Sequence, residues 1–219
     1  MTVLVVGGTG RTGRRIVAEL QRRGIPQRVL VRNAALAAQV LPPEVEVYTG
    51  DVTQPDTLVP ALVGCDRLIV ATGANPAKDG FFGPLRIDFE GTRHLLAAIQ
   101  QTPQPVQHVV LVSSLCVSRL FHPLNLFGLV LYWKRRAERL LEASGLPYTI
   151  VRPGGLKEEG SGRPILQNAD TLFEGSIPRA LVARICVEAL AEPRARNRIL
   201  EAIADPNLPD DVPLAALLP

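Results

Sequence analysis

The chain contains 219 residues, which is enough for one domain with a substantial hydrophobic core. Apolar residues make up 47% of the sequence and charged residues 21%, a balance that excludes an intrinsically disordered chain. The net charge of +3 is mild and spread over several segments, so we expect no nucleic-acid partner and favour a small anionic ligand.

Short β-branched runs alternate with longer amphipathic segments along the chain. Strands are expected at 3–6, 28–31, 45–48, 67–70, 108–112, 148–151 and 198–203. Helices are expected near 11–23, 55–63, 84–101, 129–144 and 177–191, with a short helix before residue 45. Strands this apolar on both faces fit a parallel sheet covered by helices, so the order predicts an α/β Rossmann fold: a single-domain, doubly wound parallel sheet with right-handed crossovers.

A glycine loop, GGTGRTG at residues 7–13, stands between the first strand and the first helix. Gly10 allows the backbone to approach a pyrophosphate, and Gly13 allows the helix to pack closely on the strand. The free N–H groups at the start of the helix would then face the phosphates. The residues expected to contact a dinucleotide here are Gly7, Thr9, Gly10, Arg11, Thr12 and Gly13.

The end of the second strand indicates which nucleotide is bound. An acidic residue about 20 positions after the loop would bond the ribose 2′-hydroxyl of NAD, but this chain has Arg32, nineteen residues after Gly13. A guanidinium at this place would pair with a 2′-phosphate, and Arg11 could add to that contact. The sequence therefore predicts NADP(H).

Small and polar residues follow the next two strands. Asp51 and Val52 come after the third strand, where an adenine ring would lie, although Asp51 could instead cap the helix that follows. Ala71, Thr72 and Gly73 come after the fourth strand and would let the cofactor pass.

The motifs together resemble those of the atypical short-chain dehydrogenase/reductase superfamily. They are most similar to its NAD(P)H-binding branch, which includes B-type biliverdin/flavin reductases and NmrA-like proteins. The motifs run in the expected order across about residues 2–156: GGTGRTG, LVRN, GDV, ATGA, DFEGT, VLVSS, KRRAE and SGLPYTIVRPGGL.

The resemblance implies positions for the reactive end of the cofactor. It places Ser113 and Ser114 beside the nicotinamide, Lys134 against the nicotinamide ribose, and Pro153 and Gly154 along the carboxamide. It also implies that one domain spans 1–219, with a cofactor-binding core at 1–152 and a part that shapes the substrate pocket at 153–219.

The usual catalytic tyrosine of the superfamily precedes its lysine by four residues, but Val130 holds that position here. Tyr132 lies two residues before Lys134, and residues two apart on a helix point nearly opposite ways. Reducing a simple ketone needs a positioned acid, worth roughly 10²–10⁴ in rate. A conjugated acceptor needs it much less, and Ser114 is the nearby hydroxyl that could polarise such an acceptor.

We therefore expect an NADPH-dependent reductase of a conjugated planar acceptor such as a flavin, quinone or tetrapyrrole, with Ser114 and Lys134 as catalytic candidates. An alternative is a non-catalytic NADP(H) sensor or assembly scaffold of the NmrA-like kind. A nucleotide-sugar epimerase is a weaker alternative, since it needs the tyrosine.

The apolar segment 120–133 admits three interpretations. It could be a lid for a flat substrate, with Phe121, His122, Phe127 and Trp133 as contacts. It could dock on a membrane or a partner protein. Its second half, from Leu126, could also simply begin a buried helix.

The sequence also suggests a cellular location. Three cysteines far apart fit no disulfide framework or zinc site and indicate a reducing compartment. The first strand begins so early that we expect no signal or transit peptide, and segment 120–133 is too interrupted for a transmembrane helix. We expect a cytoplasmic protein without a metal site.

Overall fold

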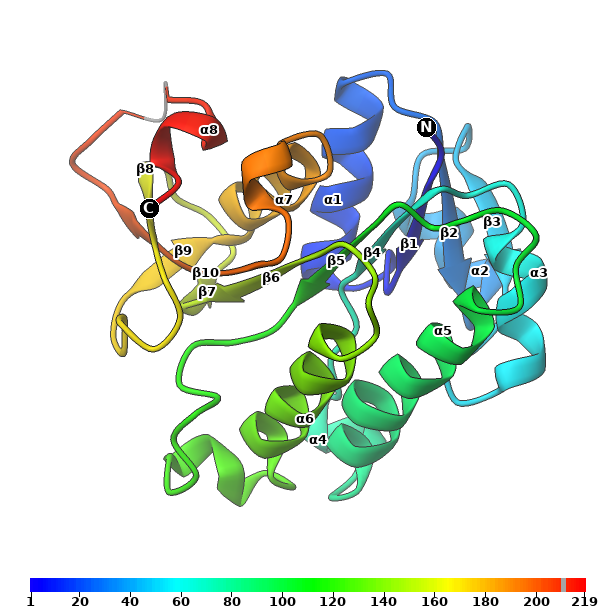
Figure 1. Cartoon of the computed structure of the whole chain (residues 1–219), viewed down its shortest axis with the longest axis horizontal. Coiled ribbons are helices and arrows are strands. Elements are labelled where there is room, and N and C mark those ends of the chain that lie inside the picture. The colour runs from blue at the N-terminus through cyan, green and yellow to red at the C-terminus, as the bar shows by residue number, and fades with distance from the viewer. Residues whose placement is uncertain (210–211) are drawn as a thin grey trace.

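The computed structural model describes residues 1–209 and 212–219 and centres on one large sheet (Figure 1). Its eight strands lie in the order β3-β2-β1-β4-β5-β6-β10-β8. They are β1 (Val3–Val6), β2 (Gln27–Val31), β3 (Glu46–Thr49), β4 (Arg67–Val70), β5 (His108–Val112), β6 (Tyr148–Pro153), β8 (Arg163–Gln167) and β10 (Arg198–Asp205). Every neighbouring pair is parallel except β8 and β10. The predicted doubly wound sheet is confirmed.

Helices cover both faces of this sheet (Figure 1). The α-helices are α1 (Arg11–Arg22), α2 (Ala34–Val40), α3 (Leu58–Leu62), α4 (Pro76–Asp79), α5 (Gly91–Ile99), α6 (Val130–Glu142), α7 (Arg179–Ala189) and α8 (Leu214–Leu217). Four shorter or irregular turns are η1 (Pro55–Thr57), η2 (Pro84–Glu90), η3 (Pro123–Leu126) and η4 (Pro193–Ala195). Helices α1 and α7 lie on one face, and α3, α5 and α6 lie on the other.

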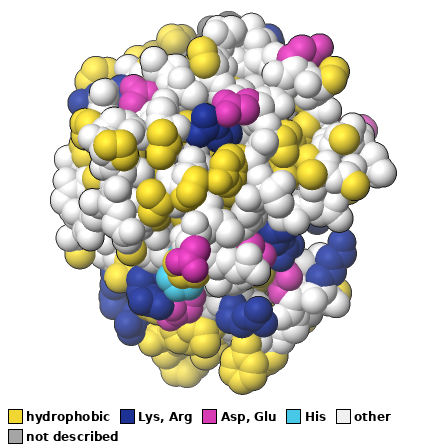
Figure 2. Space-filling view, turned by 90° about the vertical axis from the view of Figure 1, so that its right-hand side faces the viewer, with side chains coloured by type: hydrophobic (Ala, Val, Ile, Leu, Met, Phe, Trp, Pro, Cys, Tyr) yellow, Lys and Arg dark blue, Asp and Glu magenta, His cyan; other side chains and the backbone are white. Residues whose placement is uncertain are grey.

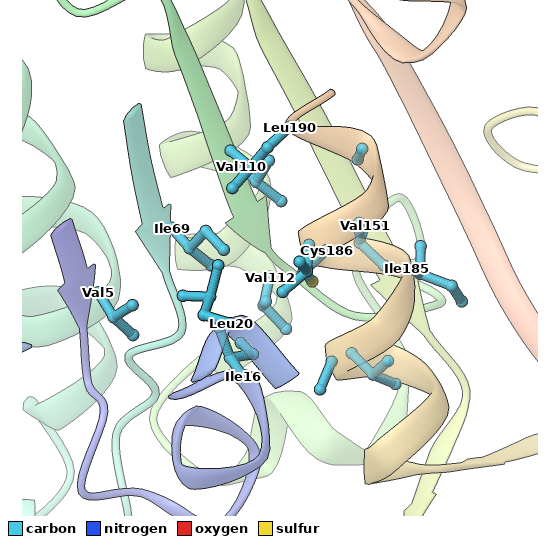
Figure 3. Close-up of a cluster of buried hydrophobic side chains, with 14 of the residues drawn as sticks. Val5, Ile16, Leu20, Ile69, Val110, Val112, Val151, Ile185, Cys186 and Leu190 are labelled. Atoms are coloured by element: carbon cyan, nitrogen blue, oxygen red, sulfur yellow. The ribbon is translucent and has the colours of Figure 1, made fainter. Parts of the chain in front are cut away.

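The inner strands β1, β2, β4, β5, β6 and β10 each contribute to two hydrophobic cores, because successive residues point to opposite faces. In β1, Val3 and Val5 join the core beneath α1 and α7, whereas Leu4 and Val6 join the core on the other face. Figure 3 shows strand and helix side chains meeting in the first core: Val5, Ile69, Val110, Val112 and Val151 with Ile16, Leu20, Ile185, Cys186 and Leu190. This double burial explains why the strands are apolar along most of their length.

Two segments that the sequence predicts as helices are only partly α-helical. Segment 84–101 begins as a π-helix, η2, and continues as α5. Segment 55–63 begins as the 3-10 turn η1 before α3. An apolar pattern near the helical period does not reveal which of these backbone hydrogen-bond spacings is adopted.

The part of the chain after residue 153 contains a second, smaller sheet that the sequence does not predict. Strand β7 (Gly155–Lys157) pairs in parallel with β9 (Ser176–Pro178). All three residues of β7 are exposed, so the strand lacks the alternation that would indicate it. A Cβ on Gly154 would lie 2.7 Å from the carbonyl oxygen of Gly175, so glycine is needed where these segments meet.

The cysteines are buried and free, and burial raises the pKa of Cys186 to about 12, which makes this thiol unreactive. Within the described residues, no group of three or more His, Cys, Asp or Glu side chains is placed to hold a metal ion. None of the described helices has both the length and the apolarity to cross a bilayer.

Candidate cofactor crevice and active site

A solvent-open crevice of about 660 Å³ lies at the carboxyl ends of β1 to β4. Nine of the residues predicted to contact the cofactor line it: Gly7, Thr9, Gly10, Arg32, Asp51, Val52, Ala71, Thr72 and Gly73. Strands β1 and β4 are neighbours at the point where the strand order reverses, which is where α/β sheets of this kind bind their ligands.

The glycine loop between β1 and α1 makes approaches that a side chain would block. Gly7 has a φ of +87°, and a Cβ there would lie 2.8 Å from the backbone of Ala71. A Cβ on Gly13 would collide with the carbonyl oxygen of Gly7, so α1 packs directly on the loop. Gly10 is the N-cap of α1 and offers no side-chain cap, which leaves the first N–H groups available to an anion. The loop therefore fits the pyrophosphate of a dinucleotide.

Arg32 stands directly after β2 at the wall of the crevice. Its side chain is 63% exposed, and its Nη1 lies 3.9 Å from Asp79 Oδ1, which is a loose ion pair. The next residue, Asn33, caps α2 by accepting a hydrogen bond from Leu36 N, so the turn that carries Arg32 is fixed. The guanidinium is thus held at the crevice with most of its surface free for an anionic ligand.

Asp51 both lines the crevice and stabilises the turn after β3. Its Oδ1 accepts hydrogen bonds from the backbone N and the hydroxyl of Thr53, at 2.8 and 2.9 Å. Both interpretations of Asp51, as a ligand contact and as a capping residue, are therefore compatible with its position. The carbonyl of Val52 lies 2.8 Å from Nδ1 of His94, which gives that histidine a structural role.

Arg11 was predicted to add to the 2′-phosphate contact, but its guanidinium points elsewhere. Its Nη1 lies 3.0 Å from Glu158 Oε1, just beyond β7. Arg179, at the start of α7, donates to the same oxygen at 2.9 Å and to the Thr12 hydroxyl at 3.1 Å. Arg15 also pairs with Glu158, at 3.2 Å. We name these three arginines with Glu158 the Glu158 cluster; it joins the glycine-loop helix to the C-terminal part of the chain.

The hydrogen bond from Arg179, reinforced by the charges of the three arginines, holds the pKa of Glu158 below its usual range. The carboxylate is therefore ionised near neutral pH. It balances one of the three positive charges that gather beside the start of α1.

A second, smaller hollow adjoins the crevice at Thr72 and contains Lys134 and Ser113. Lys134 Nζ lies 2.7 Å from Asp88 Oδ1, and the other oxygen of Asp88 accepts a hydrogen bond from Ala74 N at 3.2 Å. Ser113 is buried, and its hydroxyl has no hydrogen-bond partner among the described residues. The hollow thus joins an ion pair to a hydroxyl that is free to bind a ligand.

Asp88 is the main residue of this site that the sequence analysis did not single out. It lies in the quoted DFEGT motif, and its position in η2 buries it against α6. The available signal was a carboxylate flanked directly by two apolar residues, Ile87 and Phe89, because such a group is rarely buried without a partner.

Six predicted residues line neither hollow: Arg11, Thr12 and Gly13 at the start of α1, and Ser114, Pro153 and Gly154. Ser114 follows Ser113 after β5 and is half-buried. Pro153 ends β6, and Gly154 donates from its backbone N to the carbonyl of Ala202 at 2.9 Å. The close backbone contacts of Gly154 explain why a glycine stands at this position, and no ligand is needed to explain it.

Tyr132 and Lys134 point to different surroundings on α6. The Tyr132 hydroxyl accepts a hydrogen bond from Arg136 at 3.4 Å, and its ring packs edge-on against Trp133. Val130 begins the helix one turn before Lys134. The structure therefore brings Lys134 to Asp88 and leaves Tyr132 on another face.

Segment 120–133 does not begin as a buried helix. Phe121 and Leu126 are 97% and 80% exposed, and α6 begins only at Val130. His122 Nδ1 accepts a hydrogen bond from Leu124 N and so caps η3. Phe121, His122, Phe127 and Trp133 are absent from the lining of the cofactor crevice.

Comparison with known proteins agrees with this geometry. A family model described as NAD(P)H-binding matches residues 7–193. The chain belongs to the NAD(P)H-binding family. The solved structure of a Bacillus halodurans protein, described as an NAD-dependent epimerase/dehydratase candidate, superposes with a TM-score of 0.84 at 25% identity, over 99% of this chain and 98% of that one.

Three plant proteins resemble the chain over 94% of its length. An uncharacterised chloroplastic protein of Arabidopsis thaliana is 38% identical, over 78% of its own length. Sanguinarine reductase of Eschscholzia californica is 32% identical, over 90% of its length. Protein TIC 62 of Pisum sativum is 35% identical, but the chain spans only 43% of it.

The predicted cytoplasmic location is contradicted by these comparisons. Relatives at 38%, 35% and 35% identity are chloroplastic proteins by name. Unpaired cysteines indicate a reducing environment, but they do not distinguish one reducing compartment from another.

Proposed function

We propose that the protein is an NADPH-dependent reductase of a conjugated planar acceptor, with flavins, quinones and tetrapyrroles as the candidate classes. The observation that carries the proposal is the surroundings of Lys134. It lies beside the cofactor crevice and is paired with Asp88, while Val130 occupies the position of a proton-donating tyrosine. The similarity to a plant reductase over 90% of that protein's length supports the reaction type.

In this proposal the chain mainly binds and orients the two reactants. The glycine loop would hold the pyrophosphate, Arg32 the 2′-phosphate, and Lys134 the nicotinamide ribose. NADPH supplies a hydride, and the reduced acceptor takes its proton from solvent. Because a conjugated acceptor spreads the incoming charge, its reduction does not require a strong acid from the protein. Ser114 would polarise the acceptor.

Preference for NADPH over NADH is the part of the proposal that a single side chain tests. Arg32→Gln removes the charge at the crevice, and Arg22→Gln is a matched control on α1 with a similarly exposed arginine (65%). Losing a charge-assisted hydrogen bond costs about 1.5–3 kcal/mol, so we expect the ratio of NADPH to NADH affinity to fall about 10- to 100-fold in Arg32→Gln only.

Calorimetric titration measures both affinities without an acceptor. An unchanged affinity ratio in Arg32→Gln, or an equal loss in Arg22→Gln, would refute the role of Arg32. Because binding is measured directly, this result is separate from the question of turnover.

A non-catalytic NADP(H) sensor or assembly scaffold is a second candidate, favoured by the exposed apolar side chains of segment 120–133. Such a protein would bind NADPH without consuming it, and a partner protein would bind it differently in the presence of NADPH and of NADP⁺. Turnover of NADPH with an acceptor separates the two functions.

A further inference from the structure

An exposed apolar surface gathers at one end of the molecule. It comes from the loop before η2 and from the segment that leads into α6, both near the lower edge of Figure 1. We name it the aromatic platform, and its members are Phe81, Phe82, Leu120, Phe121, Leu124, Leu126, Phe127 and Leu129. Exposed apolar side chains collected in this way mark an interaction surface rather than ordinary scatter.

The two loops of the platform are fixed to each other. Gly128 has a φ of +74°, and a Cβ there would collide with the carbonyl oxygen of Phe81, so the loops touch through their backbones. The rings of Phe81 and Phe82 pack edge to face, with centroids 5.5 Å apart.

Asn125 holds the longer loop from within. Its amide nitrogen donates to Leu120 O at 2.7 Å, and its amide oxygen accepts from Leu131 N at 2.9 Å. Asn125 itself is buried. The backbone of the platform is therefore ordered, and its apolar side chains are exposed on a fixed surface, not on a loose loop.

The longer loop of the platform and the start of α6 carry basic residues only. No Asp or Glu occurs between residues 115 and 137, whereas Arg119, Lys134, Arg135 and Arg136 lie in that segment. Glu138, the next acid, is fully buried beside Arg152. The other loop carries both signs, Lys78 and Arg86 with Asp79 and Asp88. Figure 2 shows apolar side chains at the lower edge of one face, with both basic and acidic side chains above them.

A shallow depression connects the platform to this basic rim. It is lined by Leu120 of the platform and by Arg135, Arg136 and Arg139 of α6. Arg136 and Arg139 are exposed. Guanidinium groups bind phosphate oxygens through paired hydrogen bonds, so this depression suits an anionic phosphate group next to an apolar contact.

We propose that the aromatic platform docks on an anionic lipid bilayer. The Phe and Leu side chains would enter the acyl region, and the arginines of α6 would pair with lipid phosphates. Exposed apolar side chains on loop tips can enter a fluid acyl layer, and the arginines beside them can bind its negatively charged headgroups. This proposal does not depend on the enzymatic function proposed above.

Vesicle flotation tests the docking with the full chain. We expect binding to vesicles of phosphatidylcholine mixed with phosphatidylglycerol, weaker binding to phosphatidylcholine alone, and release by high salt. Phe121→Ser/Leu126→Ser should lower the affinity about tenfold or more, since two apolar contacts are lost. Leu36→Ser/Val63→Ser is the matched control, because both residues are exposed and lie on α2 and after α3.

Thermal unfolding checks that both double variants fold. Arg136→Glu/Arg139→Glu should abolish the preference for anionic vesicles while leaving the fold intact. Absence of binding to either kind of vesicle, or equal binding by wild type and Phe121→Ser/Leu126→Ser, would overturn the proposal. Sedimentation showing a dimer that depends on Phe121 and Leu126, without vesicle binding, would assign the platform to a second copy of the chain instead.

Discussion

Asp88 connects three parts of the site that are distant in the sequence. Its carboxylate contacts Lys134 of α6 and the backbone of Ala74 after β4, and the same hollow includes Ser113 after β5. A cationic side chain at the edge of a crevice would otherwise have several rotamers. The ion pair with Asp88 restricts Lys134 to the one that borders the crevice.

Removing the Asp88 carboxylate should therefore leave the positive charge of Lys134 without its ion-pair partner. Its side chain is only 15% exposed, and breaking a buried ion pair at one partner is strongly destabilising. We expect Asp88→Ala to lower the free energy of unfolding by about 2–4 kcal/mol, measured by urea denaturation. The double variant Asp88→Ala/Lys134→Met should lose about 1 kcal/mol less than the sum of the single variants. Additive losses would show that the pair is not coupled.

His108 makes the stability of the fold depend on pH. Its Nε2 lies 2.9 Å from the Thr149 hydroxyl, which gives its own proton to Ala195 O, so Nε2 is the donor to that hydroxyl. Burial lowers the pKa of His108 to about 4 from 6.5, with the charges of Arg196 and Arg67 adding to the effect.

Between pH 6.5 and about 4, the unfolded chain binds a proton at His108 that the folded chain does not. The free energy of unfolding should therefore fall as the pH falls through this window, by up to about 1.4 kcal/mol per pH unit. Urea denaturation at several pH values measures the slope. His108→Gln should flatten it, and equal slopes in both proteins would contradict this assignment.

At the scale of elements, the Glu158 cluster joins α1 to the C-terminal part of the chain. Arg11 and Arg15 belong to α1, whereas Arg179 begins α7 and Glu158 follows β7. The Glu158 carboxylate partly neutralises the positive charge of these arginines, close to where the pyrophosphate of a cofactor would bind. Exposed ion pairs of this kind contribute little to stability, so we expect their main effect on the binding of an anion.

Glu158→Gln should therefore bind NADPH more tightly, by about two- to fivefold, because the arginines no longer share their charge with a carboxylate. Glu159→Gln is a control at the next position, outside the cluster. The dissociation constants are measured at low and physiological ionic strength. Equal or weaker NADPH binding in Glu158→Gln, relative to the control, would refute this effect.

The main sheet could be predicted from the sequence because its strands carry their own signal. The strands at 67–70 and 108–112 agree with the structure residue for residue, since both are apolar runs with polar or glycine-containing flanks. The π-helix η2 carried no such signal, and it is what buries Asp88 against α6. Strand β7 has no apolar side facing a core, so its pairing with β9 depends on contacts far along the chain.

The candidate site divides in the same way. Residues that directly follow strands, such as Arg32 and Asp51, could be placed from sequence because parallel strands deliver their ends to one edge. The direction of Arg11 could not, since Glu158 comes from a distant segment. The sequence also did not determine whether segment 120–133 is exposed, because an apolar run has the same pattern whether it is buried or exposed to solvent.

At the scale of the whole molecule, two different surfaces belong to one chain. The crevice at β1 to β4 suits an anionic dinucleotide, and the aromatic platform lies at the loops before η2 and α6. Lys134 lies on α6, which begins directly after the platform. The platform and the lysine of the site are therefore close together in the sequence, on either side of the start of α6.

The reductase proposal is tested most directly by the consumption of NADPH. The protein is mixed with NADPH and, in turn, with flavin, quinone and tetrapyrrole acceptors, and the absorbance of the reduced nicotinamide is followed. The proposal predicts oxidation above the protein-free rate with at least one class, and slower oxidation with NADH. Tightly bound NADPH that persists with every class would contradict it and favour the sensor or scaffold.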